Sequence, residues 1–224
     1  MPETKSKNKS TINILTKVVR DPNLTVNDFG VVLYLKYCAF LCGNRYTFEV
    51  LAPEIKKYIN VQDNKTLKAS LKNLYTYGYL DESVTELKPN IPVIVRLNQS
   101  LFDVDNRSKD EFFTRLPISV LFALKDGKIN TKEARLLYYI KSYINETDTK
   151  RQFCFTRIDK KMSDELNLSK NTIPKYTQML IDKKLIYIEK HKMGTSYQYD
   201  DEGKLIYTKY NNHYFLNYEN IEKL

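Results

Sequence analysis

The sequence has few of the residues on which disulfide frameworks and metal sites depend. It contains three cysteines, Cys38, Cys42 and Cys154, and two histidines, His191 and His213. An odd and sparse set of cysteines argues against a disulfide framework. Cys38 and Cys42 are four residues apart, but a structural zinc site needs about four ligands, and neither histidine has the usual spacing. We expect no metal and no cofactor, and interpret the cysteines as small buried hydrophobic residues.

The sequence also lacks the motifs of common catalytic sites. None of G-x-S-x-G, the P-loop, H-E-x-x-H or G-x-G-x-x-G is present, and six glycines allow few loops that cradle phosphate. The carboxylate pairs Asp81-Glu82 and Asp200-Asp201 lie beside turn-like or strand-like segments, which is typical of a solvated surface. Nothing favours a catalyst built from Asp, Lys and Tyr alone. The sequence therefore predicts a protein that is not an enzyme.

Long apolar runs are absent, and positive charge is in excess. No run approaches the roughly 18 residues of a membrane-spanning helix. The N-terminus, MPETKSKNKS, has no apolar stretch behind its charges, so we expect no secretory signal and a cytoplasmic protein. Lys and Arg number 36 against 27 Asp and Glu, a net charge of +9, which favours a polyanionic partner. The 224 residues allow one large domain or two ordinary ones.

An apolar helical segment occurs twice, 105 residues apart. Asp28–Lys36 reads DFGVVLYLK, and Glu133–Lys141 reads EARLLYYIK. Each follows a turn-like stretch with Thr and Asn, Leu24–Asn27 or Ile129–Lys132. Such residues suit helix N-caps, so both segments are predicted to begin a helix there.

A second match has an offset of 107. Its apolar members are spaced by three and four residues, which indicates a short amphipathic helix in each copy. The aligned residues are Phe48, Leu51, Ile55, Ile59, Asn60 and Val61 in the first copy and Phe155, Ile158, Met162, Leu166, Asn167 and Leu168 in the second. Asn60 and Asn167 are predicted to end these helices, because asparagine tolerates the left-handed conformation.

A third match, with an offset of 106, predicts a third helix in each copy. Thr66-Leu67, Leu74 and Tyr79-Leu80 align with Thr172-Ile173, Leu180 and Leu185-Ile186. Asp63 and Ser169 are the expected N-caps. The helices are expected to end at Gly78 and at Lys183-Lys184.

Each third helix is followed by segments typical of hairpin strands, rich in β-branched and aromatic residues between turns. The expected strands are Tyr79–Val84 and Val93–Leu97 in the first copy and Leu185–Glu189, Leu205–Tyr207 and Tyr214–Leu216 in the second. Three aligned blocks in the same order favour a duplicated unit over two helical segments that match by chance.

The duplicated unit resembles a winged helix-turn-helix. In the second copy the resemblance is carried by Asn167–Ile173, which reads NLSKNTI, with Leu180 and Leu185-Ile186 after it. In the first copy it is carried by Tyr34–Tyr37 and Asn64–Leu67. The resemblance implies an α+β, mainly helical fold with two winged-helix domains in tandem that form an internal pseudo-dimer.

This resemblance also implies a division of the chain. The domains would cover residues 24–98 and 112–217, with a basic N-terminal segment at 1–23, a polar linker at 99–111 and a C-terminal end at 218–224. The second copy departs from the pattern at Pro174, since proline is tolerated only in the first turn of a helix. Its third helix must therefore begin close to Ser169–Thr172 or bend there.

In a winged helix the third helix offers its N-terminal residues to base edges in the major groove. Asparagine pairs with adenine and lysine with guanine, while residues farther along face phosphates. The DNA-binding residues implied by the resemblance are Asn64, Lys65, Thr66, Lys68 and Lys72 in the first copy and Ser169, Lys170, Asn171, Thr172, Lys175 and Gln178, with Lys190 and Lys192 beside the hairpin, in the second.

For several of these residues the sequence leaves two interpretations open. Thr66 and Thr172 either donate to phosphate or cap their helices. The lysines either contact DNA or form a solvated helix face. The basic stretch Lys5–Lys9 either adds affinity for DNA or has no function.

Tandem winged helices without a further domain are similar to two groups: the TraN-type proteins of Gram-positive conjugative plasmids, and plasmid replication initiators. We expect a monomer with an internal pseudo-two-fold axis that binds double-stranded DNA and represses a conjugative-plasmid or other mobile-element operon. One alternative is a plasmid or phage replication initiator or origin-binding accessory protein, which needs repeated origin sites and a helicase-loading partner. Another is a protein-interaction scaffold, which predicts no salt-dependent affinity for DNA.

Overall fold

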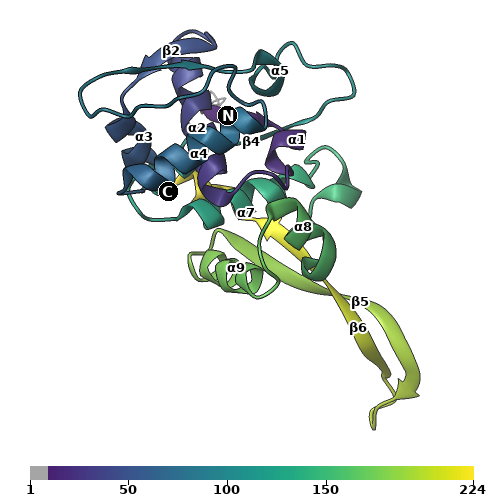
Figure 1. Cartoon of the computed structure of the whole chain (residues 1–224). Helices are drawn as coiled ribbons and strands as arrows, with labels where there is room; N and C mark the ends of the chain where they lie inside the picture. Colours follow the sequence, from purple (N-terminus) through teal and green to yellow (C-terminus); the bar gives the residue numbers. More distant parts are fainter. Residues whose placement is uncertain (1–9) are drawn as a thin grey trace, which may run out of the picture.

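The computed structural model describes residues 10–224, and in the segments 159–160, 195–196 and 206–209 the backbone alone. Within these residues the fold is α+β and mainly helical, with helices α1 to α10 and three two-stranded antiparallel sheets (Figure 1). This confirms the α+β, mainly helical part of the predicted fold class. None of the described helices combines the length and the apolar character that crossing a bilayer requires.

The first half of the chain supplies three strands and five helices, and β1 pairs with a strand of the second half. Its elements in chain order are β1 (Thr11–Leu15), α1 (Thr16–Val19), α2 (Val26–Leu41), β2 (Thr47–Val50), α3 (Ala52–Ile59), α4 (Asn64–Thr76), β3 (Val93–Arg96) and α5 (Gln99–Phe102).

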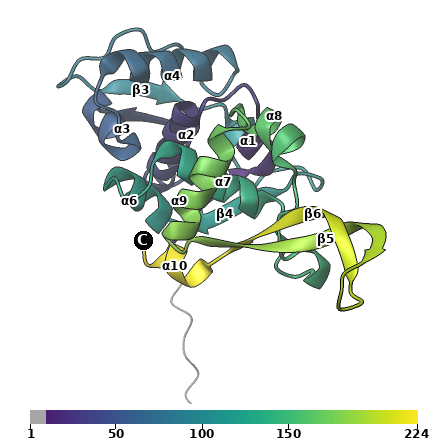
Figure 2. The ribbon, with the colours of Figure 1, turned by 90° about the horizontal axis from the view of Figure 1, so that it is seen from below.

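The second half ends in a long β-hairpin that extends away from the helical body in both views (Figure 1, Figure 2). Its elements are β4 (Phe113–Pro117), α6 (Ser119–Lys125), α7 (Thr131–Ser142), the 3-10 turn η1 (Thr149–Arg151), the π-helical turn η2 (Ile158–Met162), α8 (Ser163–Leu166), α9 (Thr172–Asp182), β5 (Ile186–Tyr199), β6 (Leu205–Leu216) and α10 (Tyr218–Glu222).

The halves meet through elements that hold the same place in each. β1 and β4 form an antiparallel pair in which Thr11 faces Pro117 and Leu15 faces Phe113. The central helices α2 and α7 pack against each other, and most of their side chains are buried. One continuous hydrophobic core therefore joins the two halves.

Both central helices begin with a reciprocal capping box. The Thr25 hydroxyl accepts from the Asp28 N–H at 3.2 Å, and the Asp28 carboxylate accepts from the Thr25 N–H at 2.7 Å. Asn130 and Glu133 make the same exchange, at 3.1 and 2.9 Å. Each box satisfies N–H groups that a helix start leaves unpaired. The predicted starts of both helices are confirmed.

The predicted helix ends are confirmed by left-handed backbone at matching positions. Asn60 has φ 53° after α3, and Asn167 has φ 51° after α8. Gly78 has φ 73° after α4, and Lys184 has φ 58° after α9. Glycine adopts this conformation freely, whereas a lysine there costs about 1 kcal/mol. Gly78 and Lys184 thus share the left-handed backbone conformation but not the residue type.

The predicted hairpin of the first copy is confirmed only in part, because β3 forms within the expected range Val93–Leu97 but the other expected strand does not. β3 pairs with β2, and Leu80 contributes a single bridge to Leu97. The expected strand Tyr79–Val84 does not form beyond that bridge. Asp81-Glu82 has low β-propensity, so the chain leaves the sheet at that point.

The hairpin of the second copy forms but is longer than predicted. The expected loop shrinks to the turn around Asp200–Lys204, and the two expected strands at 205–207 and 214–216 are one strand, β6. Polar residues between them continue the ladder because they find partners on β5. His213 also stacks on His191 and on Phe153, with ring centroids 4.7 and 3.9 Å apart. Ring stacking thus stabilises positions that the sequence pattern marks as loop.

Helices and strands also form outside the two predicted domain ranges, 24–98 and 112–217. β1 and α1 lie ahead of residue 24, and α10 follows residue 217. The expected linker begins with α5, and the Asp103 carboxylate after it accepts from the side chain of Asn106 at 2.7 Å. Phe102 and Val104 are buried, so this stretch belongs to the core rather than to a tether. The basic residues 5–9 lie outside the described residues.

The cysteines are only partly as predicted. Cys154 is buried, Cys38 is half-buried and Cys42 is exposed at the end of α2. The interpretation of all three as buried hydrophobic residues is therefore wrong for Cys42.

Candidate nucleic-acid interface

Helix α4 is fixed by its N-cap and by an apolar stripe. Asp63 accepts from the Thr66 N–H at 2.6 Å and from the Thr66 hydroxyl at 2.8 Å. These hydrogen bonds hold the pKa of Asp63 below its usual range. Leu67, Leu71 and Leu74 are fully buried. Asp63 is therefore the N-cap of α4, and the Thr66 hydroxyl donates to it rather than capping the helix itself.

The opposite face of α4 carries unpaired positive charge. Lys65, Lys68 and Lys72 are exposed, and their spacing of three and four places them on one face of the helix. None of them has a carboxylate oxygen within 4.0 Å among the described residues. Asn64 is exposed at the start of the same helix, which contains no acidic residue. Because no neighbour neutralises these lysines, their charge is available to a polyanion.

In the second copy the expected reading residues lie ahead of the helix. α9 begins at Thr172, so Ser169, Lys170 and Asn171 form a turn that leads into it. The Ser169 hydroxyl accepts from the Thr172 N–H at 3.2 Å, and the two hydroxyls lie 2.7 Å apart. Pro174 is the third residue of α9, in the first turn where proline is tolerated. Ser169 therefore accepts from the first N–H of α9 much as Asp63 accepts from the Thr66 N–H of α4, although the residue directly before α9 is Asn171.

Helix α9 is less cationic than α4. Lys175 and Gln178 are exposed, but the Gln178 amide donates to Asp182 at 2.8 Å. The Lys175 ammonium lies 5.9 Å from the ring of Tyr176. One lysine and one aspartate thus occupy the second helix where three lysines occupy the first.

Both third helices are tied to the capping boxes of the central helices. The Asn73 amide of α4 donates to Asp28 at 2.6 Å, and the Lys183 ammonium after α9 donates to Glu133 at 2.6 Å. Asp28 and Glu133 are each 1% exposed. A buried carboxylate that accepts from a helix start and from a second helix fixes the angle between the two. These anchors position the exposed faces of α4 and α9.

A double-mutant cycle tests the anchor of α9. We expect Glu133→Ala and Lys183→Ala to be coupled by about 1–2 kcal/mol in urea unfolding, because the pair is largely buried. Glu133→Ala alone should cost more than Lys183→Ala, since it also breaks the bond to the Asn130 N–H. The exposed pair Glu202–Lys204 is the control, with an expected coupling of about 0.5 kcal/mol or less. Equal coupling in the two pairs would contradict the anchor.

The hairpin carries its positive charge on the stem. Lys190 and Lys192 are exposed and two residues apart on β5, so they share a face of the strand. The tip instead contains Asp200, Asp201 and Glu202, all exposed. The stem, rather than the tip, is therefore the part suited to phosphates.

No protein-family model matches the chain, and no curated protein matches its sequence. The case for a function consequently depends on the residues and the geometry. The exposure of the α4 lysines was predictable from their helical spacing, but three arginines that line a pocket between the halves were not: Arg20, Arg115 and Arg151. These residues come from three distant segments, so no local pattern joins them.

Proposed function

We propose that the chain is a double-stranded DNA-binding protein made of two winged-helix modules, and that it regulates transcription of a mobile-element operon. The observation that supports DNA binding best is the exposed lysine face of α4, which no carboxylate among the described residues neutralises. In this proposal Asn64 and Lys65 contact base edges in the major groove, and Lys68 and Lys72 contact phosphates. The regulatory role follows from the resemblance alone.

The two modules are proposed to read unequal half-sites. The start of α4 offers Asn64 and Lys65, whereas the turn before α9 offers Lys170 and Asn171. A homodimer presents identical helices and needs a palindrome. Two different helices in one chain need no such symmetry, so the operator is expected to be asymmetric, with the stronger phosphate contacts at the first module.

Protection of the chain's own upstream DNA from nuclease tests the proposal. The full chain should protect a defined segment over its promoter, and protection should weaken steeply between 50 and 200 mM salt. Protection over repeated origin sequences instead would identify the replication initiator. Uniform or absent protection would contradict sequence-specific binding and leave the scaffold as the better hypothesis.

Lys170→Ala with Asn171→Ala should abolish the specific footprint and leave weak non-specific binding. Two lost base contacts cost about 2–4 kcal/mol, at least a tenfold loss of specific affinity. The matched control is Lys88→Ala with Asn90→Ala, which removes the same residue types from an exposed turn. Undiminished specific binding in the first variant would show that the second module is assigned to the wrong residues.

A further inference from the structure

A pocket of about 690 Å³ lies where the two halves meet. One wall is α1 of the first half, and the others are β4, the end of α7 and the loop that follows it. Pockets of about 300–1,000 Å³ are the usual size of small-molecule sites. The pocket takes in none of the residues assigned above to DNA.

Positive charge in this pocket exceeds negative charge. Lys141 pairs with Glu146, and Arg151 lies 3.6 Å from Asp148. Two further cations, Arg20 and Arg115, line the same pocket and have no carboxylate within 4.0 Å among the residues described. A pocket with unbalanced cations favours an anionic ligand.

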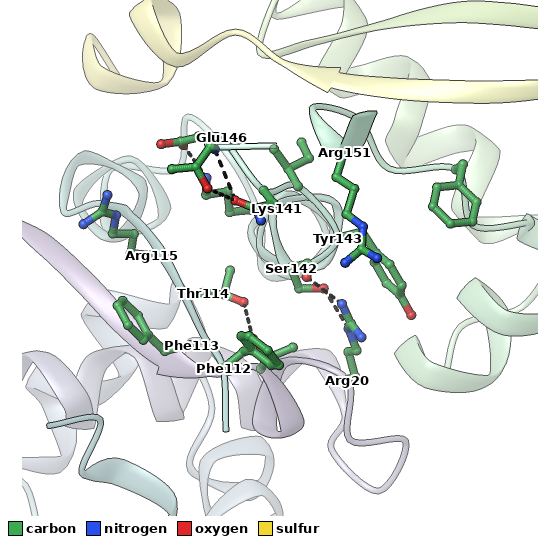
Figure 3. A pocket seen from close by; sticks show the side chains of 15 residues that line it. Arg20, Phe112, Phe113, Thr114, Arg115, Lys141, Ser142, Tyr143, Glu146 and Arg151 are labelled. Atoms are coloured by element: carbon green, nitrogen blue, oxygen red, sulfur yellow. Dashed lines mark hydrogen bonds and ion pairs between the residues drawn. The ribbon is translucent and has the colours of Figure 1, made fainter. Parts of the chain in front are cut away.

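The Arg20 guanidinium is held in one orientation. It lies 3.6 Å from the centroid of the Tyr143 ring and donates to the Ser142 hydroxyl at 2.9 Å and to the Ser142 carbonyl at 2.6 Å. These bonds use Nε and one terminal nitrogen, which leaves the other nitrogen as a donor. Figure 3 shows Arg20 and Arg151 approaching Tyr143 from opposite sides. A guanidinium that is already ordered loses little entropy when it binds an anion.

The rim of the pocket presents aromatic rings to solvent. Phe112 is 75% exposed and Phe155 is 53% exposed. Phe113 also lines the pocket, but it is half-buried, and its ring lies apart from that of Phe112 in Figure 3. Large apolar side chains left exposed at the edge of a pocket are typical of a site for a ligand with apolar surface. Planar rings also stack on such side chains with defined geometry.

The corresponding place in the first half is a smaller pocket whose lining contains no arginine. Lys36, the counterpart of Lys141, lines a cavity of about 260 Å³ and donates to the Phe102 carbonyl at 2.5 Å. Val104 and Asp105 line that cavity as well. The two halves thus differ here, and arginines line only the larger pocket, at α1, β4 and the end of α7.

We propose that the pocket between α1, β4 and the end of α7 binds a small organic anion that carries a planar aromatic ring. The anionic group lies between Arg20 and Arg151, and the ring packs against Phe112. Nucleotides and aromatic carboxylates share this chemistry. The proposal does not depend on DNA binding.

Fluorescence titration of the full chain with 8-anilinonaphthalene-1-sulfonate, an aromatic anion, tests the site. We expect saturable binding of one probe per chain. Arg115→Gln and Arg151→Gln should each weaken binding at least fivefold, whereas Arg45→Gln, at an exposed site outside the pocket, should change it less than twofold. Melting curves identify any variant that fails to fold.

Displacement of the probe identifies the chemistry of the ligand. Adenosine monophosphate and salicylate should each displace it better than sodium phosphate. The stronger competitor of the two shows whether the site prefers a nucleotide or an aromatic carboxylate. Phe112→Ala should weaken binding of the probe at least fivefold. Leu41→Ala, which removes another exposed apolar side chain outside the pocket, is the control.

Three results would overturn the site. The first is the absence of saturable binding, and the second is equal loss in Arg45→Gln and the two pocket variants. The third is that Arg115→Gln and Arg151→Gln lower the affinity for the probe and the affinity for duplex DNA equally. That result would make the pocket part of the surface that binds DNA. Displacement by phosphate as efficient as by the aromatic anions would overturn the aromatic part. Loss of DNA binding with the probe site intact would overturn only the proposed function.

Discussion

Replacement of Lys65, Lys68 and Lys72 together by alanine should lower the affinity for duplex DNA by about 10²–10³ at 0.1 M salt. Each lysine that contacts a phosphate releases about 0.9 counterion from the duplex. Loss of three such contacts should therefore reduce the slope of log affinity against log salt by about 2.7. Titrations of a labelled duplex at several salt concentrations measure both quantities.

The control must remove the same net charge from elsewhere. Lys88, Lys109 and Lys223 are exposed and lie outside α4 and α9, so their replacement by alanine lowers the net charge equally. Long-range attraction alone would make the two triple variants equivalent. Equal slopes would contradict a direct contact between α4 and DNA. The same experiment on Lys175 should give a smaller change, because α9 carries a single lysine.

Arg135→Met should lower the melting temperature by about 6–12 °C. Arg135 is fully buried on α7, and its guanidinium donates to the carbonyls of Asp21, Leu24 and Glu165. Asp21 and Leu24 belong to the first half and Glu165 to the second, so one side chain joins both. Burial lowers the pKa of Arg135 to about 10, which still leaves it charged at neutral pH.

The expected cost follows from the acceptors left behind. Methionine fills much of the volume but donates no hydrogen bond, so three carbonyls lose a donor and the buried Asp28 carboxylate loses a nearby cation. Breaking such a buried charged network costs about 3 kcal/mol. For a chain of this length each kcal/mol shifts the melting temperature by about 2–4 °C. Differential scanning calorimetry measures the shift.

Arg45→Met, at an exposed position, is the control and should leave the melting temperature within about 1 °C. An unchanged or higher melting temperature for Arg135→Met would show that desolvation of the guanidinium outweighs its hydrogen bonds. That outcome is known for buried ion pairs replaced by well-packed apolar side chains.

The sequence predicted elements wherever the physical cause is local. Thr25 and Asn130 start helices because a side-chain oxygen three residues from a carboxylate satisfies the first N–H groups. Asn60 and Asn167 end helices because their backbone tolerates positive φ. The exposed lysines of α4 were also predictable, since their spacing opposes that of Leu67, Leu71 and Leu74.

The sequence did not predict how the strands pair, because the residues that decide the pairing are far apart in the chain. β3 is rich in β-branched residues, as a hairpin strand should be, yet it pairs with β2, and helices α3 and α4 lie between these two strands in the chain. The β5–β6 hairpin runs through polar residues because rings from Phe153, His191 and His213 stack across it. Neither arrangement leaves a periodic signal within one segment.

The starts of α2 and α7, the turns that end α3, α4, α8 and α9, and the basic face of α4 were determined by the sequence alone, because hydrogen bonds within a few residues and helical periodicity decide them. Tertiary structure alone decided how the two halves join. The β1–β4 pair, the buried Arg135 and the pocket lined by Arg20 and Arg151 each combine residues far apart in the chain, and only the packing of one half on the other brings those residues together.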